Sequence, residues 1–166
     1  MHKYIDHLKN EKFNSNGLDL SSLRIIASTG SPLAEESFKY VYENIKEDVH
    51  LSSIACGTDM VGCLVLGNLY SAVYKGEIQG QSLGIDVDVF TDDGKSTSDG
   101  EKGELVVKQP FPSMPVKFWG DDDDQKYHKA YFTRFKNIWH HGDFIERTLN
   151  NGFIMRGRSD ATLNPG

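Results

Sequence analysis

Residues 23–56 are LRIIASTGSPLAEESFKYVYENIKEDVHLSSIAC, and this stretch decides the expected fold. The apolar run at 23–29 is typical of a strand that is buried in a parallel sheet. Apolar side chains at helical spacing predict a helix over 34–45, and a second apolar run covers 49–56. A strand, a helix and a second strand in this order predict a βαβ unit, in which the two strands are parallel.

Beyond Gly84 the pattern becomes that of antiparallel strands. Residues 85–90 (IDVDVF) alternate apolar and acidic side chains, as a half-exposed strand does. The turn residues that follow are Asp and Gly, and residues 104–108 (ELVVK) provide a returning strand. We therefore expect a β-hairpin over 85–108.

The last third of the chain is less regular. Three prolines between 110 and 115 predict an irregular crossing. The four aspartates at 121–124 have neither the spacing nor the central glycine of a calcium loop, so we expect a solvated loop tip. Gly142-Asp143 is expected to be a loop, and 153–155 the start of a last short strand. The chain closes on Asn-Pro-Gly with no terminal element, and we expect both ends to be truncations of a longer chain.

Composition limits the function classes. A formal net charge of −6 argues against a nucleic-acid binder, which normally carries a basic surface, but it does not argue against ATP or CoA. No run approaches the length of a membrane span, and the N-terminus lacks an apolar stretch of signal-peptide type. We expect a cytoplasmic protein with no membrane partner, in which the two cysteines are buried and reduced.

A glycine follows the first predicted strand, in Ser28-Thr29-Gly30-Ser31-Pro32. Small residues at this point let a ligand approach the backbone closely. Alone the signal is weak, because a glycine that is needed only for the turn explains it at least as well.

A hydroxyl and a carboxylate follow the second predicted strand, in Gly57-Thr58-Asp59. Threonine can donate a hydrogen bond to a phosphate oxygen, and aspartate can bind the magnesium ion that accompanies the phosphate. The alternative is a helix start, with Thr58 as its cap and Asp59 complementing the helix dipole.

Two further polar positions lie near the C-terminal end. Asp143, in His141-Gly142-Asp143, could accept two hydrogen bonds from a ribose diol. Arg158, in Gly157-Arg158-Ser159-Asp160, offers a planar fork to phosphate or ribose oxygens. The alternatives are a turn aspartate and an exposed ion pair that contributes little.

The order of these motifs carries a resemblance that no single motif does. STGSP, GTD, GELVV, YFTRFKNIWHHGD and GRSD follow one another as in the adenylate-forming superfamily of acyl-CoA synthetases, luciferases and peptide-synthetase adenylation domains. The chain resembles the acetyl-CoA and acetoacetyl-CoA synthetase branch more closely. IASTGSPL, VYKGEIQ and GRSDATLNPG are most similar to the members that use acetoacetate, and the resemblance runs from about Leu23 to Gly166.

The resemblance implies roles for matching positions. A catalytic role falls on Thr58 at the α-phosphate and on Asp59, which would also be the metal ligand, although the family usually has a glutamate there. Asp143 matches the aspartate that holds the ribose hydroxyls, and Asp160 matches the hinge of a C-terminal lid. The implied nucleotide-binding residues are Gly30, Ser31, Pro32, Gly57, Thr58, Asp143 and Arg158.

The resemblance also implies an acyl pocket at Ala55 and Cys56, where the related acetate enzymes have bulky tryptophans. Small residues there would leave room for a longer acid such as acetoacetate. The expected fold is α/β, with part of a parallel-sheet subdomain over 1–84, a distorted antiparallel β-barrel over 85–155, and a hinge over 156–166. The phosphate-gripping loop would precede Met1, and the lid with its lysine would follow Gly166.

The implied activity of the longer protein is AMP-forming ligation of acetoacetate to CoA, with ATP, Mg²⁺ and CoA as cosubstrates. We expect the fragment alone to be inactive. Three alternatives stay open: a CoA ligase for another short-chain acid, a catalytically inactive remnant, and a β-rich interaction module.

Overall fold

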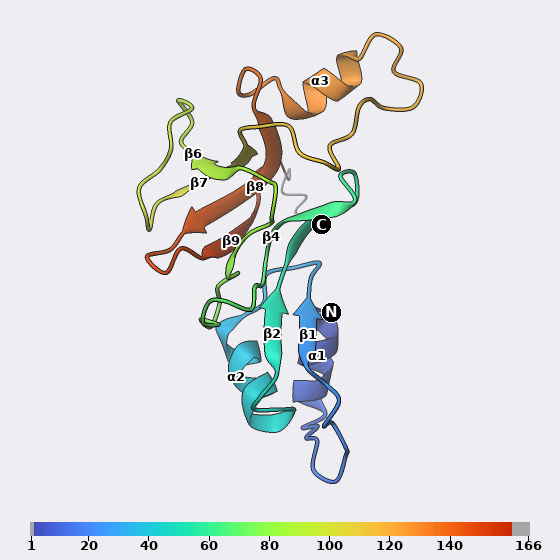
Figure 1. Ribbon diagram of the computed structural model, residues 1–166, viewed down its shortest axis with the longest axis vertical. Helices are drawn as coiled ribbons and strands as arrows, with labels where there is room; N and C mark the ends of the chain where they lie inside the picture. The colour runs from blue at the N-terminus through green and yellow to red at the C-terminus, as the bar shows by residue number, and fades with distance from the viewer. Residues whose placement is uncertain (1, 161–166) are drawn as a thin grey trace.

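The computed structural model describes residues 2–160 of the chain. The molecule is elongated, with a small α/β part at one end and an antiparallel sheet at the other (Figure 1). In the described range, every helix is too short or too polar to span a membrane.

The α/β part contains the predicted βαβ unit. Strand β1 (Ile25–Ser28) pairs in parallel with β2 (His50–Ser53), and α2 (Glu35–Asn44) connects them. This confirms the unit predicted over 23–56. A first helix, α1 (His2–Asn10), was not predicted from the polar N-terminal sequence. Both helices contribute to one core, which consists of Ile5, Leu33, Phe38, Val41, Val49 and Leu51.

The second predicted strand is in fact two strands. β2 ends at Ser53, and after Ile54 the chain joins a different sheet as β3 (Ala55–Gly57). β3 pairs antiparallel with β4 (Gly62–Leu66), which also pairs with β5 (Gly80–Gln81). The apolar run at 49–56 did not reveal this break, because both strands are partly buried.

The other end of the molecule is a four-stranded antiparallel sheet (Figure 1). Its strands are β6 (Val87–Phe90), β7 (Lys102–Val107), β8 (Trp139–Arg147) and β9 (Phe153–Arg158), paired in sequence order. The predicted hairpin over 85–108 is confirmed. The sheet is open: over residues 2–160 it does not close into the expected barrel.

Two local expectations were wrong. Asp143 lies inside β8, at an irregular point of the strand where Gly142 has a positive φ of 82° and the pairing with β7 shifts register between Val106 and Glu104. The aspartates at 121–124 are not all solvated. Asp121 is buried and accepts hydrogen bonds from the backbone N–H groups of Lys126 and Tyr127, at the start of α3 (Gln125–Tyr131).

Candidate functional site

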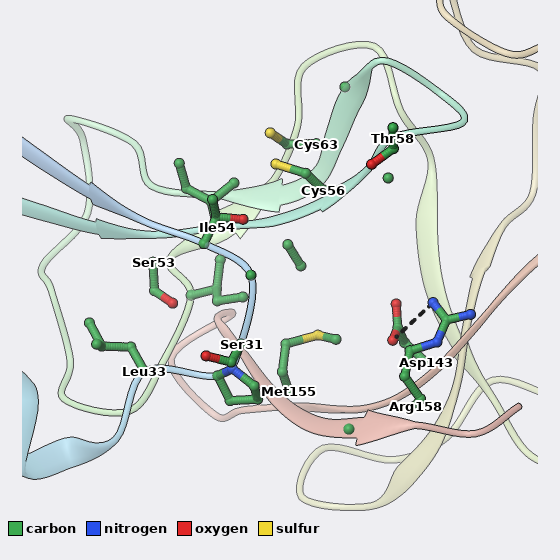
Figure 2. A pocket seen from close by; sticks show the side chains of 18 of the residues that line it. Ser31, Leu33, Ser53, Ile54, Cys56, Thr58, Cys63, Asp143, Met155 and Arg158 are labelled. Carbon is green, nitrogen blue, oxygen red and sulfur yellow. Dashed lines mark hydrogen bonds and ion pairs between the residues drawn. The ribbon is translucent and has the colours of Figure 1, made fainter. Parts of the chain in front are cut away.

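A cavity of about 580 Å³ lies between the two parts of the molecule. The segments after β1 and after β2 form one side, and the facing strands β8 and β9 form the other. Figure 2 shows Asp143 and Arg158 at one end of this cavity, with Leu33, Ser53 and Ile54 towards the other. The end of a parallel strand pair is a usual place for a ligand in α/β proteins.

A second cavity, of about 590 Å³, adjoins the first. The two share Cys56, Gly57, Thr58 and Arg158 in their walls. The second also reaches Asp59, Tyr131, His141 and Asp160. We call the two together the double cavity.

The structure brings all the residues singled out in the sequence to the double cavity, although 128 positions separate Gly30 from Arg158. Asp59 and Asp160 lie in the second cavity only. The first cavity is lined by Gly30, Ser31, Pro32, Ala55, Cys56, Gly57, Thr58, Asp143 and Arg158. Of the expected hinge, residues 161–166 lie outside the described residues.

Asp143 and Arg158 face each other across β8 and β9, where they form a paired position of the ladder. Arg158 Nη1 lies 3.5 Å from Asp143 Oδ1, and the same guanidinium also donates through Nε to Asp160 Oδ1 at 2.8 Å. Burial raises the pKa of Asp143, while the nearby His141 and Arg158 act in the opposite direction. One carboxylate is thus partly desolvated beside a cation that two aspartates share.

The protonation of His141 follows from its neighbours. The Trp139 indole N–H can only donate, and it lies 3.3 Å from His141 Nδ1, which must therefore be the unprotonated acceptor. Nε2 then carries the proton and faces Asp143 Oδ2 at 3.7 Å. Burial lowers the pKa of His141 despite the nearby Asp143 and Asp59. His141 is thus neutral, with its N–H directed at Asp143.

An aromatic support holds Asp59. The Tyr131 hydroxyl donates a hydrogen bond to Asp59 Oδ2. The Tyr131 ring stacks on Trp139, with ring centroids 3.7 Å apart and an interplanar angle of 12°. Burial, followed by the contact with Asp59, raises the pKa of Tyr131, so this hydroxyl stays a donor. Asp59 is fixed in place by a tyrosine that a buried tryptophan orients.

Gly57 occupies a position with no room for a side chain. A Cβ there would lie 2.5 Å from Asp59 Oδ1 and 2.8 Å from His141 Cε1. The glycine therefore lets the Asp59 carboxylate and the His141 ring approach the same piece of backbone.

A buried carboxylate joins the strands behind the double cavity. Glu104, on β7, is fully buried, and its Oε2 accepts hydrogen bonds from Ser159 Oγ at 2.6 Å and from His140 Nε2 at 2.8 Å. Its Oε1 forms an ion pair with Arg134 Nη1 at 3.0 Å, without the angle of a hydrogen bond. Glu104 thereby ties β7 and β8 to the segment that carries Arg158 and Asp160.

Several residues of the double cavity were missed in the sequence. Ile78 and Met155 give the first cavity apolar walls, and nothing in the sequence placed them there. Tyr131 and His141 belong to the quoted YFTRFKNIWHHGD stretch, but only the fold turns them towards Asp59 and Asp143.

The cysteines were expected to be buried. Instead Cys56 is exposed and Cys63 partly exposed, because β3 and β4 form a wall of the cavity.

Sequence comparison identifies relatives for nearly the whole chain. The acetoacetyl-coenzyme A synthetase of Rhizobium meliloti is 58% identical over 165 residues, which is 99% of this chain and 25% of that protein. The acetoacetyl-CoA synthetase of Gallus gallus is 47% identical over 148 residues, 89% of this chain and 22% of that protein. This chain is similar to one quarter of an acetoacetyl-CoA synthetase. No protein-family model matches it.

Solved structures agree with the sequence relatives. The acetoacetyl-CoA synthetase from Streptomyces lividans superposes with a TM-score of 0.89 at 35% identity, over 98% of this chain and 26% of that one. A benzoate CoA ligase from Burkholderia xenovorans superposes with a TM-score of 0.69 at 24% identity, over 86% of this chain and 27% of that one, which supports the fold alone. The chain therefore has the fold of part of an adenylate-forming ligase, and it spans about a quarter of the acetoacetyl-CoA synthetases it matches.

Proposed function

We propose that this chain forms the nucleotide and acid-binding wall of an AMP-forming acetoacetate–CoA ligase. The observation that carries the proposal is the convergence of Gly30, Thr58, Asp143 and Arg158 on one cavity with small residues at Ala55 and Cys56. The similarity to acetoacetyl-CoA synthetases over 99% of the chain supports the choice of acid.

In this proposal the longer protein performs two steps. The acetoacetate carboxylate attacks the α-phosphorus of ATP, and pyrophosphate leaves. The CoA thiolate then attacks the carbonyl of the acyl-adenylate, and AMP leaves. The residues of this chain position the reactants and stabilise charge at the α-phosphate, which is where such enzymes gain most of their rate.

The residues divide by chemistry along the double cavity. Gly30, with a φ of 93°, and the adjacent Ser31 and Pro32 would lie against adenine and ribose, and Asp143 would accept hydrogen bonds from the ribose hydroxyls. Arg158 would contact ribose and phosphate. The neutral His141, whose N–H faces Asp143, would hold that carboxylate in place.

At the α-phosphate, the Thr58 hydroxyl would donate to a phosphate oxygen and the Asp59 carboxylate would face the magnesium ion of the nucleotide. The residues fit such an ion. Tyr131 engages Oδ2 of Asp59 and leaves Oδ1 for a ligand. Among residues 2–160, no group of three or more candidate metal ligands occurs. A single carboxylate is still compatible with Mg²⁺, because this ion commonly uses one or two carboxylates together with substrate phosphates and waters. When bound, the ion would neutralise phosphate charge.

The larger organisation is part of the same proposal. Residues 1–84 would belong to an α/β subdomain and 85–155 to a barrel-like subdomain, completed by segments of the longer protein that lie outside this chain. Asp160, exposed and bound to Arg158, would be the hinge of a lid. A cytoplasmic location stays a prediction.

Grafting tests the proposal. This chain would replace the matching quarter of the Rhizobium meliloti protein, which is 58% identical. We expect the graft to form acetoacetyl-CoA from acetoacetate, ATP and CoA, with acetate a poorer substrate, and the isolated 166-residue chain to form none. A folded graft that prefers another acid would contradict the acid assignment, and a folded graft without any ligase activity would indicate an inactive remnant.

A further inference from the structure

Two cysteines face each other across the β3–β4 hairpin. Cys56 and Cys63 are directly paired residues, one step before the Gly57–Gly62 pair that closes the hairpin. Directly opposite residues of an antiparallel pair project from the same face, with Cα atoms about 4.5 or 5.5 Å apart. A disulfide needs a Cα separation of about 4.4–6.8 Å. The backbone therefore already has the spacing that a Cys56–Cys63 bond requires.

Both thiols are also reachable from solvent. Cys56 is exposed, Cys63 is partly exposed, and both line the first cavity, where Figure 2 shows their sulfur atoms close to one another. Burial and the contact with the Cys56 thiol raise the pKa of Cys63 to about 12. Cys63 thus keeps its proton at neutral pH, and the exposed Cys56 is the thiol that an oxidant meets first.

The backbone at this pair is fixed rather than free. The Ser82 hydroxyl donates a hydrogen bond to the Cys63 carbonyl, and β4 is held on its other side by β5. An effective thiol pair needs such a scaffold, because the second sulfur must remain beside the first after the first has reacted.

We propose that Cys56 and Cys63 form a redox-sensitive dithiol, which hydrogen peroxide converts into a disulfide in the cavity wall. The Cys56 thiol releases its proton to solvent, its thiolate attacks one peroxide oxygen, and the O–O bond breaks. Sulfenic acid and hydroxide result, and the hydroxide takes up a proton to give the first water. The Cys63 sulfur then attacks the Cys56 sulfur; the S–S bond forms, the S–O bond breaks, and the hydroxyl leaves as water with the Cys63 proton. In sum, two thiols and one peroxide give one disulfide and two waters.

The reaction of these two thiols does not depend on which acid the longer protein uses. The thiol pair reacts with the oxidant, and disulfide formation requires no nucleotide or acid in the cavity. The sequence alone predicted two buried, reduced cysteines, whereas in the structure Cys56 is exposed and Cys63 partly exposed.

The test uses the reduced 166-residue chain, its secondary structure checked by circular dichroism, treated with hydrogen peroxide after removal of reductant. Intact-mass measurement should show a loss of two hydrogens, thiol titration a loss of both thiols, and non-reducing peptide mapping a Cys56–Cys63 link that dithiothreitol reverses. Cys63→Ser should instead gain oxygen on Cys56, and Cys56→Ser, which keeps only the protonated Cys63 thiol, should react much more slowly. Independent oxygen gain on both cysteines of the wild type, or dimers as its main product, would overturn the proposal.

Because only six residues separate the two cysteines, an unfolded chain could also close the bond. The rate of Cys56–Cys63 disulfide formation should be several-fold higher in native buffer than in denaturing urea. Equal rates of disulfide formation would contradict a role for the hairpin. Phenylarsine oxide gives a second readout that needs no oxidant: it bridges two adjacent thiols with loss of water. When 2-mercaptoethanol is added as a competitor, the native chain should keep one bound arsenical and each single-cysteine variant should lose it. Loss of the arsenical from the native chain would also overturn the proposal.

Discussion

Cys56 is the residue at which side-chain volume should decide the acid. On the proposed function, Cys56→Trp in the graft fills the space that the second carbonyl and the methyl group of acetoacetate need. Overpacking costs about 1–3 kcal/mol, and one pocket contact is worth roughly 10–200-fold in discrimination. The ratio of kcat/KM for acetoacetate to kcat/KM for acetate should decrease by a factor within that range.

The matching control is the melting temperature of the same variant. If tryptophan merely destabilises the hairpin, both acids should lose kcat/KM equally and the melting temperature should fall. That outcome would remove Cys56 from the acyl pocket and leave the acid unassigned.

His141 gives the chain a predictable dependence on pH. Burial lowers the pKa of His141 in the folded state below the ordinary value of 6.5. Between pH 6.5 and the folded-state pKa, the unfolded state therefore binds a proton that the folded state does not bind. The unfolding free energy should therefore fall as the pH drops from 6.5 to the folded-state pKa. The loss is about 1.4 kcal/mol for each unit by which the pKa is lowered.

Thermal melts at a series of pH values check this. His141→Gln keeps an acceptor for the Trp139 N–H but cannot be protonated, so its melting temperature should fall less on acidification than that of the wild type. His7→Gln, at an exposed position, should show the same change of melting temperature with pH as the wild type. Identical slopes for the wild type and His141→Gln would show that another group causes the acid sensitivity.

Glu104 acts at the scale of the sheet elements, because its carboxylate joins β7, β8 and the segment after β9. Removing one partner of a buried, paired charge leaves the others unsatisfied and typically costs about 3–5 kcal/mol. Urea unfolding of Glu104→Ala should show a loss in this range. Glu47→Ala, at an exposed position, should change the unfolding free energy by about 0.5 kcal/mol or less. Equal losses would mean that the network contributes nothing specific.

Elements with strong periodicity could be predicted from the sequence. The helix over 34–45 and the hairpin over 85–108 follow from apolar spacing and turn residues, and both are present as α2 and as β6 with β7. α3 could not be predicted, because its first turn is held by the buried carboxylate of Asp121, four residues before the helix, and not by a side chain at the N-cap position. The break at Ile54 is equally hidden, since it depends on which strand each half pairs with.

The convergence of the candidate residues could be predicted from the sequence, but their geometry could not, and their roles stay a prediction. Gly30, Thr58 and Asp143 were selected because each follows or ends an expected element, and the fold brings all three to one cavity. The neutral state of His141 and the support of Asp59 by Tyr131 depend on contacts across 72 positions of sequence or on burial. No local pattern encodes them.

At the scale of the whole molecule, the double cavity belongs to neither part alone. One wall comes from the α/β part and the β3–β4 hairpin, and the other from β8 and β9, with α3 at the second cavity. The chain spans about a quarter of its relatives, so the proposed reaction requires the remainder of a longer protein. On the proposed function, this junction is where the α-phosphate of ATP is attacked.

Acetoacetate-dependent exchange of labelled pyrophosphate into ATP tests that claim most directly, because it reports adenylation without CoA. The graft should catalyse the exchange. Asp143→Asn and Thr58→Val should each lower it roughly 10–150-fold, as expected for a lost hydrogen bond to a charged group. Asp99→Asn, on an exposed turn, should leave it unchanged. Folded Asp143→Asn and Thr58→Val grafts that exchange pyrophosphate at the unmodified rate would place the adenylation site outside this cavity and contradict the account.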